Sequence, residues 1–389
     1  MRFTWPIFYA ILFLYRCGYS VIAQTIIARL TPLGDAGSFQ TSATPLLSNF
    51  SIPLLIAAPR QVAQQVAITI GGGFHRIFAG EPILINVGFQ AIAFVGIVAL
   101  LRAVKPGIRI WLAALLMLPS FSIWSSVAGK EALVVFATGI LGAYIVRSFR
   151  NEGRFRFLEL LALAIVATSK PQYLPAFAFL FSGIAVGRYV RRKVFFTALG
   201  AFASLAMLYA ARDWLSGEIA NIPGNFVVAA GHDGLAGGRS TRASFWVERY
   251  DYIWKSPEGM FQSFFGPTLA EAQTGILQAM SFAESTIIFA ILALVAIRNL
   301  PTLPLYIFVL TGFSLLWLLF GTYPFGIMNP GSAIRYRTGY EIIVFTLILV
   351  VLSRPTYVSW QESIGWARLR RRPPPTSGNA ISEPASPSN

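Results

Sequence analysis

The strongest constraint on this chain is a series of apolar stretches that suit a lipid bilayer. A membrane-spanning helix needs about 20 largely apolar residues, because hydrocarbon offers no water to unpaired backbone groups. We identify ten candidate spans, at 5–27, 82–101, 110–124, 132–146, 157–168, 173–187, 194–211, 281–297, 303–320 and 340–352. Only 12% of the 389 residues are charged, which is about half the usual share in a soluble domain. The sequence therefore predicts an all-α, polytopic transmembrane helix bundle of about ten spans.

Two polar breaks separate pairs of short spans. Residues 125–131 form the first break and residues 168–172 the second. A polar break persists at membrane depth only where it is buried in protein or lines a wet cavity. We therefore expect both breaks to lie at turns that the rest of the bundle encloses.

Basic residues set the predicted orientation. The chain carries 31 Lys and Arg against 16 Asp and Glu, a net charge of +15. With ten spans, the basic clusters around 102–109, 147–156 and 188–193 and in the tail all fall on one side. That side is cytoplasmic by the positive-inside rule. Both termini are then cytoplasmic, and the basic excess reflects topology rather than a nucleic-acid partner.

This topology divides the chain into a membrane domain, 1–353, and a basic, Pro- and Ser-rich tail, 354–389, which we expect to be disordered. Two large loops, about 30–80 and 212–280, lie on the extracytoplasmic side, and a shorter one covers 321–338. A single cysteine and two histidines exclude a disulfide framework and a Cys- or His-rich metal centre.

The first candidate residue on the outer side is Asp35, which stands between glycines after the first span. Such a carboxylate can take a proton from a sugar hydroxyl as a general base. An aspartate in a turn or at a helix N-cap is an equally good interpretation.

Segment 44–80 is too apolar for an ordinary loop, and polar residues interrupt it. We predict amphipathic or re-entrant helices along the outer surface. Arg60, His75 and Arg76 can meet phosphate there. The alternative is a simple interfacial helix whose arginines snorkel to water.

The first polar break ends in Gly129-Lys130-Glu131. At the tip of a short helical hairpin, Lys130 can neutralise a pyrophosphate while Glu131 holds the lysine in place. The alternative is an ion pair at a helix start, where Glu131 favours the helix dipole. Lys170, before Pro171, is a similar case at the next outer turn.

The largest outer loop mixes charges with aromatic residues. Aromatic faces stack on sugar rings, and arginines bind hydroxyls and phosphates. Arg239, Arg242 and Arg249 are the arginines that we select there, beside Trp246 and Trp254. The alternative for the aromatic residues is an interfacial belt.

Arg335 and Arg337 stand directly before the last span, on the outer edge, where topology disfavours positive charge. A lipid-linked diphosphate would compensate them. The alternative is that both arginines bind lipid headgroups or Glu341.

The hairpin 118–131, the segment Phe265-Gly-Pro267 followed by Glu284, and Arg335-Tyr-Arg337 together carry a family resemblance. The chain resembles the Wzy-like and EpsG-like polymerases of bacterial surface polysaccharides over most of residues 1–353. Asp35 on an early outer loop also resembles the catalytic aspartate of GT-C glycosyltransferases.

One departure from the family pattern concerns the outer loop. Some of these polymerases have an arginine, ten residues and then a glycine; Arg249 and Gly259 miss that spacing by one. The role of any single arginine in this loop is therefore not carried over from the family.

The resemblance implies a reaction at the outer face of the bacterial cytoplasmic membrane. A glycan on an isoprenoid diphosphate would be transferred to another lipid-linked repeat unit in exopolysaccharide or O-antigen synthesis. The lipid diphosphate is the leaving group, so no nucleotide or other cofactor is expected. Partners would be the isoprenoid-diphosphate-linked oligosaccharide, membrane lipids and other polysaccharide assembly proteins.

The same resemblance suggests roles for the candidate residues. Arg335, Arg337 and Lys130 would bind the diphosphate, with Glu131 and Arg60 beside them. The outer-loop arginines Arg239, Arg242 and Arg249 would bind the donor or acceptor glycan, and Asp35 would be the base.

Two other functions compete with polymerisation. A GT-C transferase would add a single sugar from a polyprenyl-phosphate donor. A non-enzymatic transporter or flippase would carry the lipid-linked glycan across the membrane. A flippase needs polar residues along its spans towards the cytoplasmic side, whereas here the polar residues crowd at the outer edge.

Overall fold

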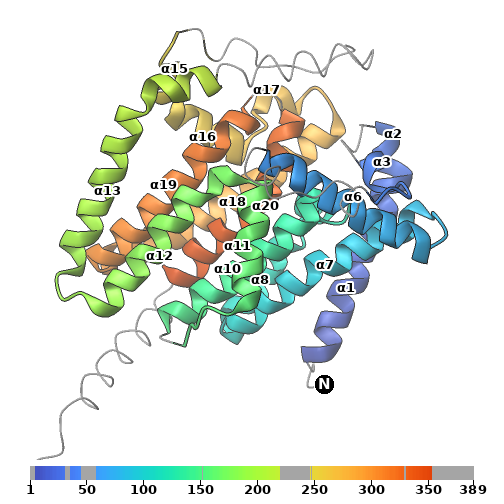
Figure 1. Cartoon of the computed structure of the whole chain (residues 1–389), viewed down its shortest axis with the longest axis horizontal. Helices are drawn as coiled ribbons and strands as arrows, with labels where there is room; N and C mark the ends of the chain where they lie inside the picture. Colours follow the sequence, from blue (N-terminus) through green and yellow to red (C-terminus); the bar gives the residue numbers. More distant parts are fainter. Residues whose placement is uncertain are drawn as a thin grey trace, which may run out of the picture.

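A computed structural model describes residues 5–30, 36–44, 58–150, 152–219, 246, 248–327 and 330–352. Every regular element in these residues is helical (Figure 1). Asp35, Arg239 and Arg242 lie outside the described residues, as does the tail.

The first half of the chain contains α1 (Trp5–Ile22), η1 (Ala23–Ile27), α2 (Ala28–Leu30), α3 (Ala36–Phe39), α6 (Pro59–Ile77), α7 (Pro82–Ala103), α8 (Pro106–Leu116), α9 (Pro119–Ser125), α10 (Lys130–Phe149), α11 (Phe157–Ser169), η2 (Pro171–Tyr173) and α12 (Leu174–Tyr189). The second half contains α13 (Lys193–Ala210), α15 (Asp251–Trp254), α16 (Ser256–Phe265), α17 (Leu269–Ala272), α18 (Ile276–Asn299), η3 (Leu300–Thr302), α19 (Leu305–Gly326), α20 (Pro330–Phe345) and η4 (Thr346–Val351). Residues 212–219 are helical as well.

Six helical runs in the described residues are long and apolar enough to cross a membrane. They are Trp5–Ile27, Pro82–Ala103, Lys130–Phe149, Lys193–Ala210, Ile276–Thr302 and Leu305–Gly326. These runs indicate a membrane protein. The all-helical fold is confirmed for the described residues, whereas the predicted count of about ten spans and the orientation of the termini are not.

The difference in count has a physical cause in the polar breaks and in short helices. α8 and α9 pass the test for a span only as a pair, and they meet at a bend of 75°. α11 has 13 residues, and at a rise of about 1.5 Å per residue it is shorter than the hydrocarbon core of about 30 Å. α12 has 16 residues. α20 continues into η4 as far as Val351, which is long enough, but Arg335, Arg337 and Glu341 make it more polar than the six long runs. All ten predicted segments are helical over most of their length, but four of them do not form a straight apolar span.

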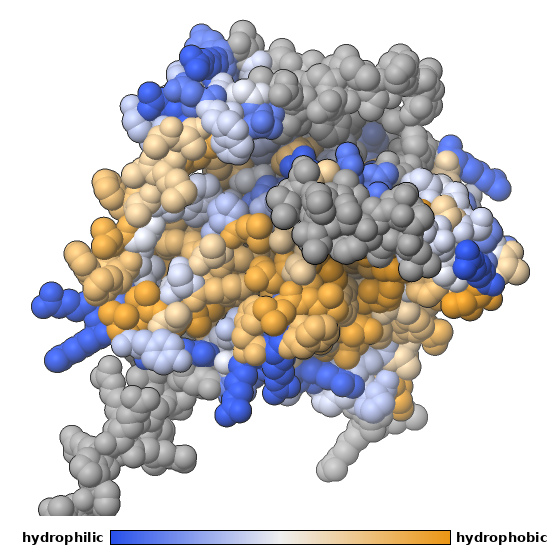
Figure 2. Space-filling model, viewed as in Figure 1, coloured by the Kyte–Doolittle hydropathy of each residue, from blue (hydrophilic) through white to orange (hydrophobic). Residues whose placement is uncertain are grey.

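The surface agrees with a membrane environment. Figure 2 shows apolar side chains gathered in a band across the middle of the molecule, with hydrophilic side chains above and below it. A band of this kind remains exposed in a soluble protein only at a large cost, whereas lipid covers it without cost.

The core is centred on α10, which lies parallel to α7. Gly96 of α7 and Gly139 of α10 face each other, and a Cβ atom on either glycine would collide with the backbone of the opposite helix. Small residues allow this close approach of two helices in a membrane protein. Near the start of α7, Asn86 Oδ1 accepts from the Ala128 backbone N–H just before α10, so both helices run towards the same end of the bundle.

The basic loops gather at that end. The Arg109 guanidinium lies 4.0 Å from the centre of the Trp5 ring, at the start of α1. Arg188, at the end of α12, donates to the Ser148 carbonyl oxygen at 2.7 Å, at the end of α10. The two polar breaks and the start of α20 therefore lie at the opposite end.

We expect Gly139→Ala to lower the thermal midpoint of the purified protein. The new methyl group must push α10 away from α7, and overpacking of this kind costs about 1–3 kcal/mol. Gly312→Ala in α19 is the matched control, because no atom lies within 4 Å of the position of its Cβ. A thermal scan of the detergent-solubilised variants measures both; an unchanged midpoint for Gly139→Ala contradicts the close contact.

Candidate functional site

A buried carboxylate lies where three distant segments meet. Glu131, in the first turn of α10, is 5% exposed. Its Oε1 atom accepts a hydrogen bond from Arg335 Nε at 3.0 Å. The Nζ atom of Lys170 lies 3.9 Å from the same oxygen. Lys170 precedes Pro171, which disfavours helical backbone at the lysine, so α11 ends there and presents the amine to the start of α10.

Cations outnumber the acid at this point. Lys170 lies in the break after α11, outside the candidate spans. Burial lowers the pKa of Lys170 to about 8; the Glu131 charge raises that pKa, and the charges of Arg335, Lys130 and Arg60 lower it. We call these four cations, together with Glu131, the cationic cluster. Among the residues that the structure describes, one carboxylate faces these four cations, so this part of the chain carries an excess of positive charge there.

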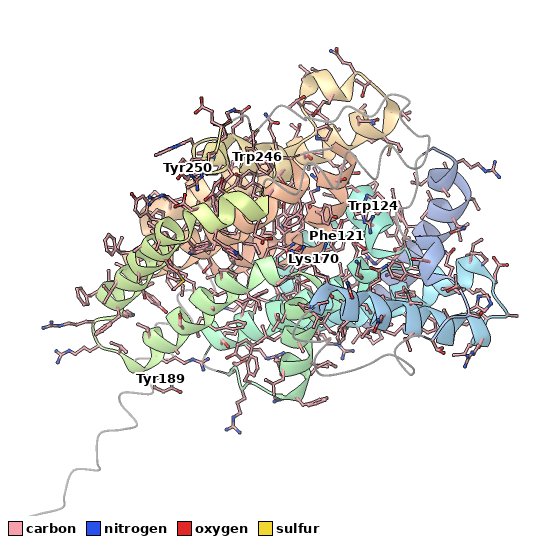
Figure 3. The ribbon with its side chains drawn as sticks, turned by 45° about the horizontal axis from the view of Figure 1, so that its top comes forward. Phe121, Trp124, Lys170, Tyr189, Trp246 and Tyr250 are labelled. Carbon is pink, nitrogen blue, oxygen red and sulfur yellow. The ribbon has the colours of Figure 1, made fainter. Side chains whose placement is uncertain are left out.

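Aromatic rings stand beside these cations. The Lys170 Nζ atom lies 4.2 Å from the centre of the Tyr336 ring. The Arg335 guanidinium lies 5.8 Å from the centre of the Trp124 ring. Figure 3 shows Trp124 and Lys170 together in the middle of the molecule. Cation–π contacts stabilise the charges only in part, and the rings add flat, apolar faces to the cluster.

Arg60 belongs to the cationic cluster and comes from segment 44–80, which the sequence predicts to lie along the outer surface. It lies in the first turn of α6, a helix of 19 residues, and its side chain is exposed. Its guanidinium lies 5.5 Å from the centre of the Phe325 ring, and that ring lies 6.0 Å from the Tyr336 ring. α6 thus places one cation at the rim of the cluster, above the partly buried rings of α19 and α20.

The hairpin that carries Lys130 and Glu131 is held by α1. Arg16, in the middle of that helix, is fully buried. Its Nη1 atom donates to the Leu116 carbonyl oxygen at 2.9 Å, and its Nη2 atom donates to the Ser125 hydroxyl. These partners are neutral oxygens at the last residue of α8 and the last residue of α9. Arg16 therefore fixes the bend that leads into the start of α10.

A second set of polar side chains comes from α7. The Asn86 Oδ1 atom accepts from the backbone N–H of Ala128 at 2.8 Å, and the Ser126 hydroxyl donates to Gln90 Oε1 at 2.9 Å. Asn86 and Gln90 are four residues apart, so they lie on one face of the helix. Together with Arg16 they make hydrogen bonds to the Ala128 backbone N–H and to the hydroxyls of Ser125 and Ser126.

Arg16, Asn86 and Gln90 were not selected from the sequence, although two features of the sequence indicate a polar face inside the bundle. An ionisable residue within a span, such as Arg16, is a functional hypothesis by default. Asn86 and Gln90 repeat at helical spacing in an apolar segment. Both signals mark a polar interior face.

Arg335 and Arg337 do not act together. Residues two positions apart on a helix point to nearly opposite sides. Arg337 is 1% exposed, and its Nη1 atom donates to the Ser285 hydroxyl at 2.6 Å and to the Phe264 carbonyl oxygen at 3.1 Å. Its Nη2 atom donates to the Ser120 hydroxyl at 2.9 Å. Arg337 thus joins α9, α16 and α18 to α20.

Two buried acids accompany Arg337. The Glu341 Oε1 atom lies 3.9 Å from Arg337 Nε, the partner that the alternative interpretation named. The backbone N–H of Ser120 donates to both carboxylate oxygens of Glu284, at 3.2 and 3.0 Å. The segment around Arg337 is therefore a closed polar junction between helices.

Arg249 lies in a different place from the cationic cluster. Its Nη2 atom lies 2.8 Å from Asp213 Oδ1, and both side chains are more than half exposed. In Figure 3 the neighbouring Tyr250 lies well apart from Trp124 and Lys170. Of the predicted binding residues within the described ranges, the structure brings together Arg60, Lys130, Glu131 and Arg335, and it leaves Arg249 and Arg337 outside.

The cationic cluster suits an anion with several oxygen atoms. Arginine offers a planar fork of N–H donors, and lysine offers a point charge. A phosphate group between them would restore the charge balance and raise the lowered pKa of Lys170. The described residues contain no group of three or more His, Cys, Asp or Glu that could hold a metal ion.

The function of the chain has to be inferred from the geometry of the site. No family model matches the chain, and no curated protein or solved structure matches it either.

Proposed function

We propose that the protein is a glycosyltransferase of the bacterial cytoplasmic membrane that polymerises lipid-linked oligosaccharide repeat units at the outer face. One observation carries the proposal: the cationic cluster, in which the described cations outnumber the described acid, lies at the end of the bundle opposite to the basic loops. The positive-inside rule makes that end extracytoplasmic. Lysine and arginine are disfavoured on the extracytoplasmic side, so an anionic ligand that binds them is a physical reason for their presence there.

A lipid diphosphate meets this requirement. It carries a negative charge on each phosphate, and its isoprenoid chain stays in the bilayer while the phosphates lie at the edge. The rings of Trp124 and Tyr336, next to Arg335 and Lys170, offer flat faces for the sugar that follows the phosphate. The cluster therefore has a surface for each polar part of the substrate.

The proposed reaction needs the protein mainly to stabilise charge. A hydroxyl of the acceptor sugar attacks the anomeric carbon of the donor glycan, and the bond between that carbon and the phosphate oxygen breaks. The diphosphate leaves with the electron pair, and Arg335, Lys130 and Lys170 stabilise the charge that develops on it. The acceptor proton passes to a base, for which Asp35 remains our candidate.

The finer topology belongs to this proposal. The bent α8–α9 pair, α11, α12 and α20 with η4 complete ten crossings when they are added to the six long runs. Both termini then lie in the cytoplasm. Short crossings are compatible with a membrane that thins locally at its outer edge.

Reconstitution of the purified full chain with lipid-linked repeat units tests the function. We expect a ladder of products without added nucleotide. Addition of one sugar from a polyprenyl-phosphate donor, with no ladder, would identify a GT-C transferase instead. Movement of the lipid-linked unit across the vesicle membrane with no new glycosidic bond would identify a flippase. Either result contradicts polymerisation.

We expect binding of a diphosphate ligand to weaken as the pH rises past about 8. Lys170, whose pKa burial lowers to about 8, is charged below that pH and loses its charge above it. At about pH 9 the affinity falls by about tenfold, because each pH unit above the pKa costs about 1.4 kcal/mol to restore the proton. Lys170→Arg stays charged and flattens this profile; the same pH dependence in that variant would exclude Lys170.

A further inference from the structure

A cavity outside the cationic cluster opens between α16, the start of α17 and α18. Its volume is about 290 Å³, close to the lower limit of ligand pockets, which is roughly 300 Å³. Four phenylalanine rings contribute most of its wall, together with a proline and a leucine: Phe261, Phe265, Phe282, Phe289, Pro267 and Leu269. A space of this size and lining accepts a segment of a narrow apolar molecule.

The polar side chains of the lining already have partners. Gln262, Thr268, Ser285 and Thr286 are the residues concerned. Gln262 donates to Glu258 at 2.8 Å, Thr268 to Glu271 at 3.1 Å, Ser285 to the Gly266 carbonyl oxygen at 3.0 Å and Thr286 to the Phe282 carbonyl oxygen at 2.8 Å. A polar ligand would have to compete with these hydrogen bonds, whereas a hydrocarbon leaves them intact.

The mouth of the cavity is apolar and exposed. Phe261, Phe289 and Leu269, all part of the lining, are 53%, 45% and 62% exposed. The lining residues of α18 lie roughly 9 to 20 Å along the helix from its first residue. α18 belongs to a candidate span, and its lining residues fall inside the predicted span 281–297, close to its outer end. Lipid chains therefore reach the opening from the side of α18, within a hydrocarbon core about 30 Å thick.

We propose that this cavity binds one hydrocarbon chain of a lipid. A convex helix surface only borders lipid, whereas a concave wall of aromatic rings encloses a chain segment and gains contact on several sides. Ser285, which lines the cavity, also accepts the hydrogen bond from Arg337 at 2.6 Å. A chain seated here packs directly against the junction of α16, α18 and α20. The chain can come from a bilayer phospholipid or from a prenyl phosphate.

Photocrosslinking of the full chain in nanodiscs tests this inference. One arm uses a phospholipid with a diazirine in its acyl chain, and the other uses a prenyl phosphate with a diazirine in its isoprenoid chain. Mass spectrometry maps the labelled residues. We expect labels on Phe261, Phe265, Phe282 and Phe289, and the arm that gives them identifies the source of the chain.

A pair of neighbouring substitutions separates the cavity from the general lipid surface. Thr286→Trp fills the cavity from an exposed position on α18. Ile287→Trp adds the same ring one residue along, at a position that is 50% exposed and outside the lining. We expect labelling of the lining to fall several-fold in the first variant and to persist in the second. Absence of label from the lining in both arms, or equal labelling in both variants, overturns the inference. The result does not depend on glycosyltransferase activity.

Discussion

Arg335→Ala is expected to abolish polymer formation while the protein remains folded in the membrane. Arg335 is the arginine of the cationic cluster that lies against Glu131, with a hydrogen bond of 3.0 Å. Loss of one preorganised donor to a developing anion costs about 100- to 1,000-fold in rate. Rates of ladder formation by reconstituted wild type and variant measure the effect.

A control variant and a stability measurement make this result interpretable. Arg298→Ala removes one arginine from an exposed position in the last turn of α18, so we expect wild-type rates from it. Arg335→Ala leaves Glu131 with Lys170 as its cationic contact, so the carboxylate stays compensated. The variant should therefore keep its thermal midpoint while it loses activity. Wild-type rates in Arg335→Ala would exclude Arg335 from the site.

Arg337→Ala is expected to fail in a different way, by loss of folded protein. Its guanidinium is 1% exposed and makes hydrogen bonds to three other segments. Removal leaves the buried Glu341 carboxylate without its cationic neighbour. Breaking a buried ion pair on one side costs about 3–5 kcal/mol. The amount of monodisperse protein after extraction, and its thermal midpoint, should both drop.

The partner acid supplies the control for Arg337. We expect Glu341→Gln in the Arg337→Ala background to recover part of the thermal stability, because the uncompensated charge is gone. Arg337→Ala with a wild-type thermal midpoint and no polymer would contradict a structural role and return Arg337 to the substrate site.

Arg335 and Arg337 show which properties can be predicted from the sequence and which cannot. Apolar runs predicted the long helices, because the length and hydropathy of a segment are local properties. The short helices α15, α16 and α17 lie in the predicted outer loop and were not predicted. The direction of a side chain depends on the backbone at that position. The sequence placed Arg335 and Arg337 together on an outer edge, but α20 begins at Pro330, so both residues are helical and point apart.

The cationic cluster was predicted in parts and not as a whole. Lys130 and Glu131 stood out as a polar break, yet the partners of Glu131 are Arg335 and Lys170. These contacts join residues far apart in the chain, and periodicity carries no information about them. Arg16 was missed because its neutral oxygen partners belong to other helices.

Binding of a short-chain prenyl diphosphate to the purified full chain is the decisive experiment for the cationic cluster. We expect the wild type to bind the diphosphate more tightly than the corresponding prenyl alcohol. We expect Arg335→Ala to weaken diphosphate binding by about 10- to 100-fold, the equivalent of one charge-assisted hydrogen bond of about 1.5–3 kcal/mol, and to leave alcohol binding unchanged. Equal affinities for diphosphate and alcohol in the wild type, or an unchanged diphosphate affinity in Arg335→Ala, would contradict a diphosphate site at this cluster.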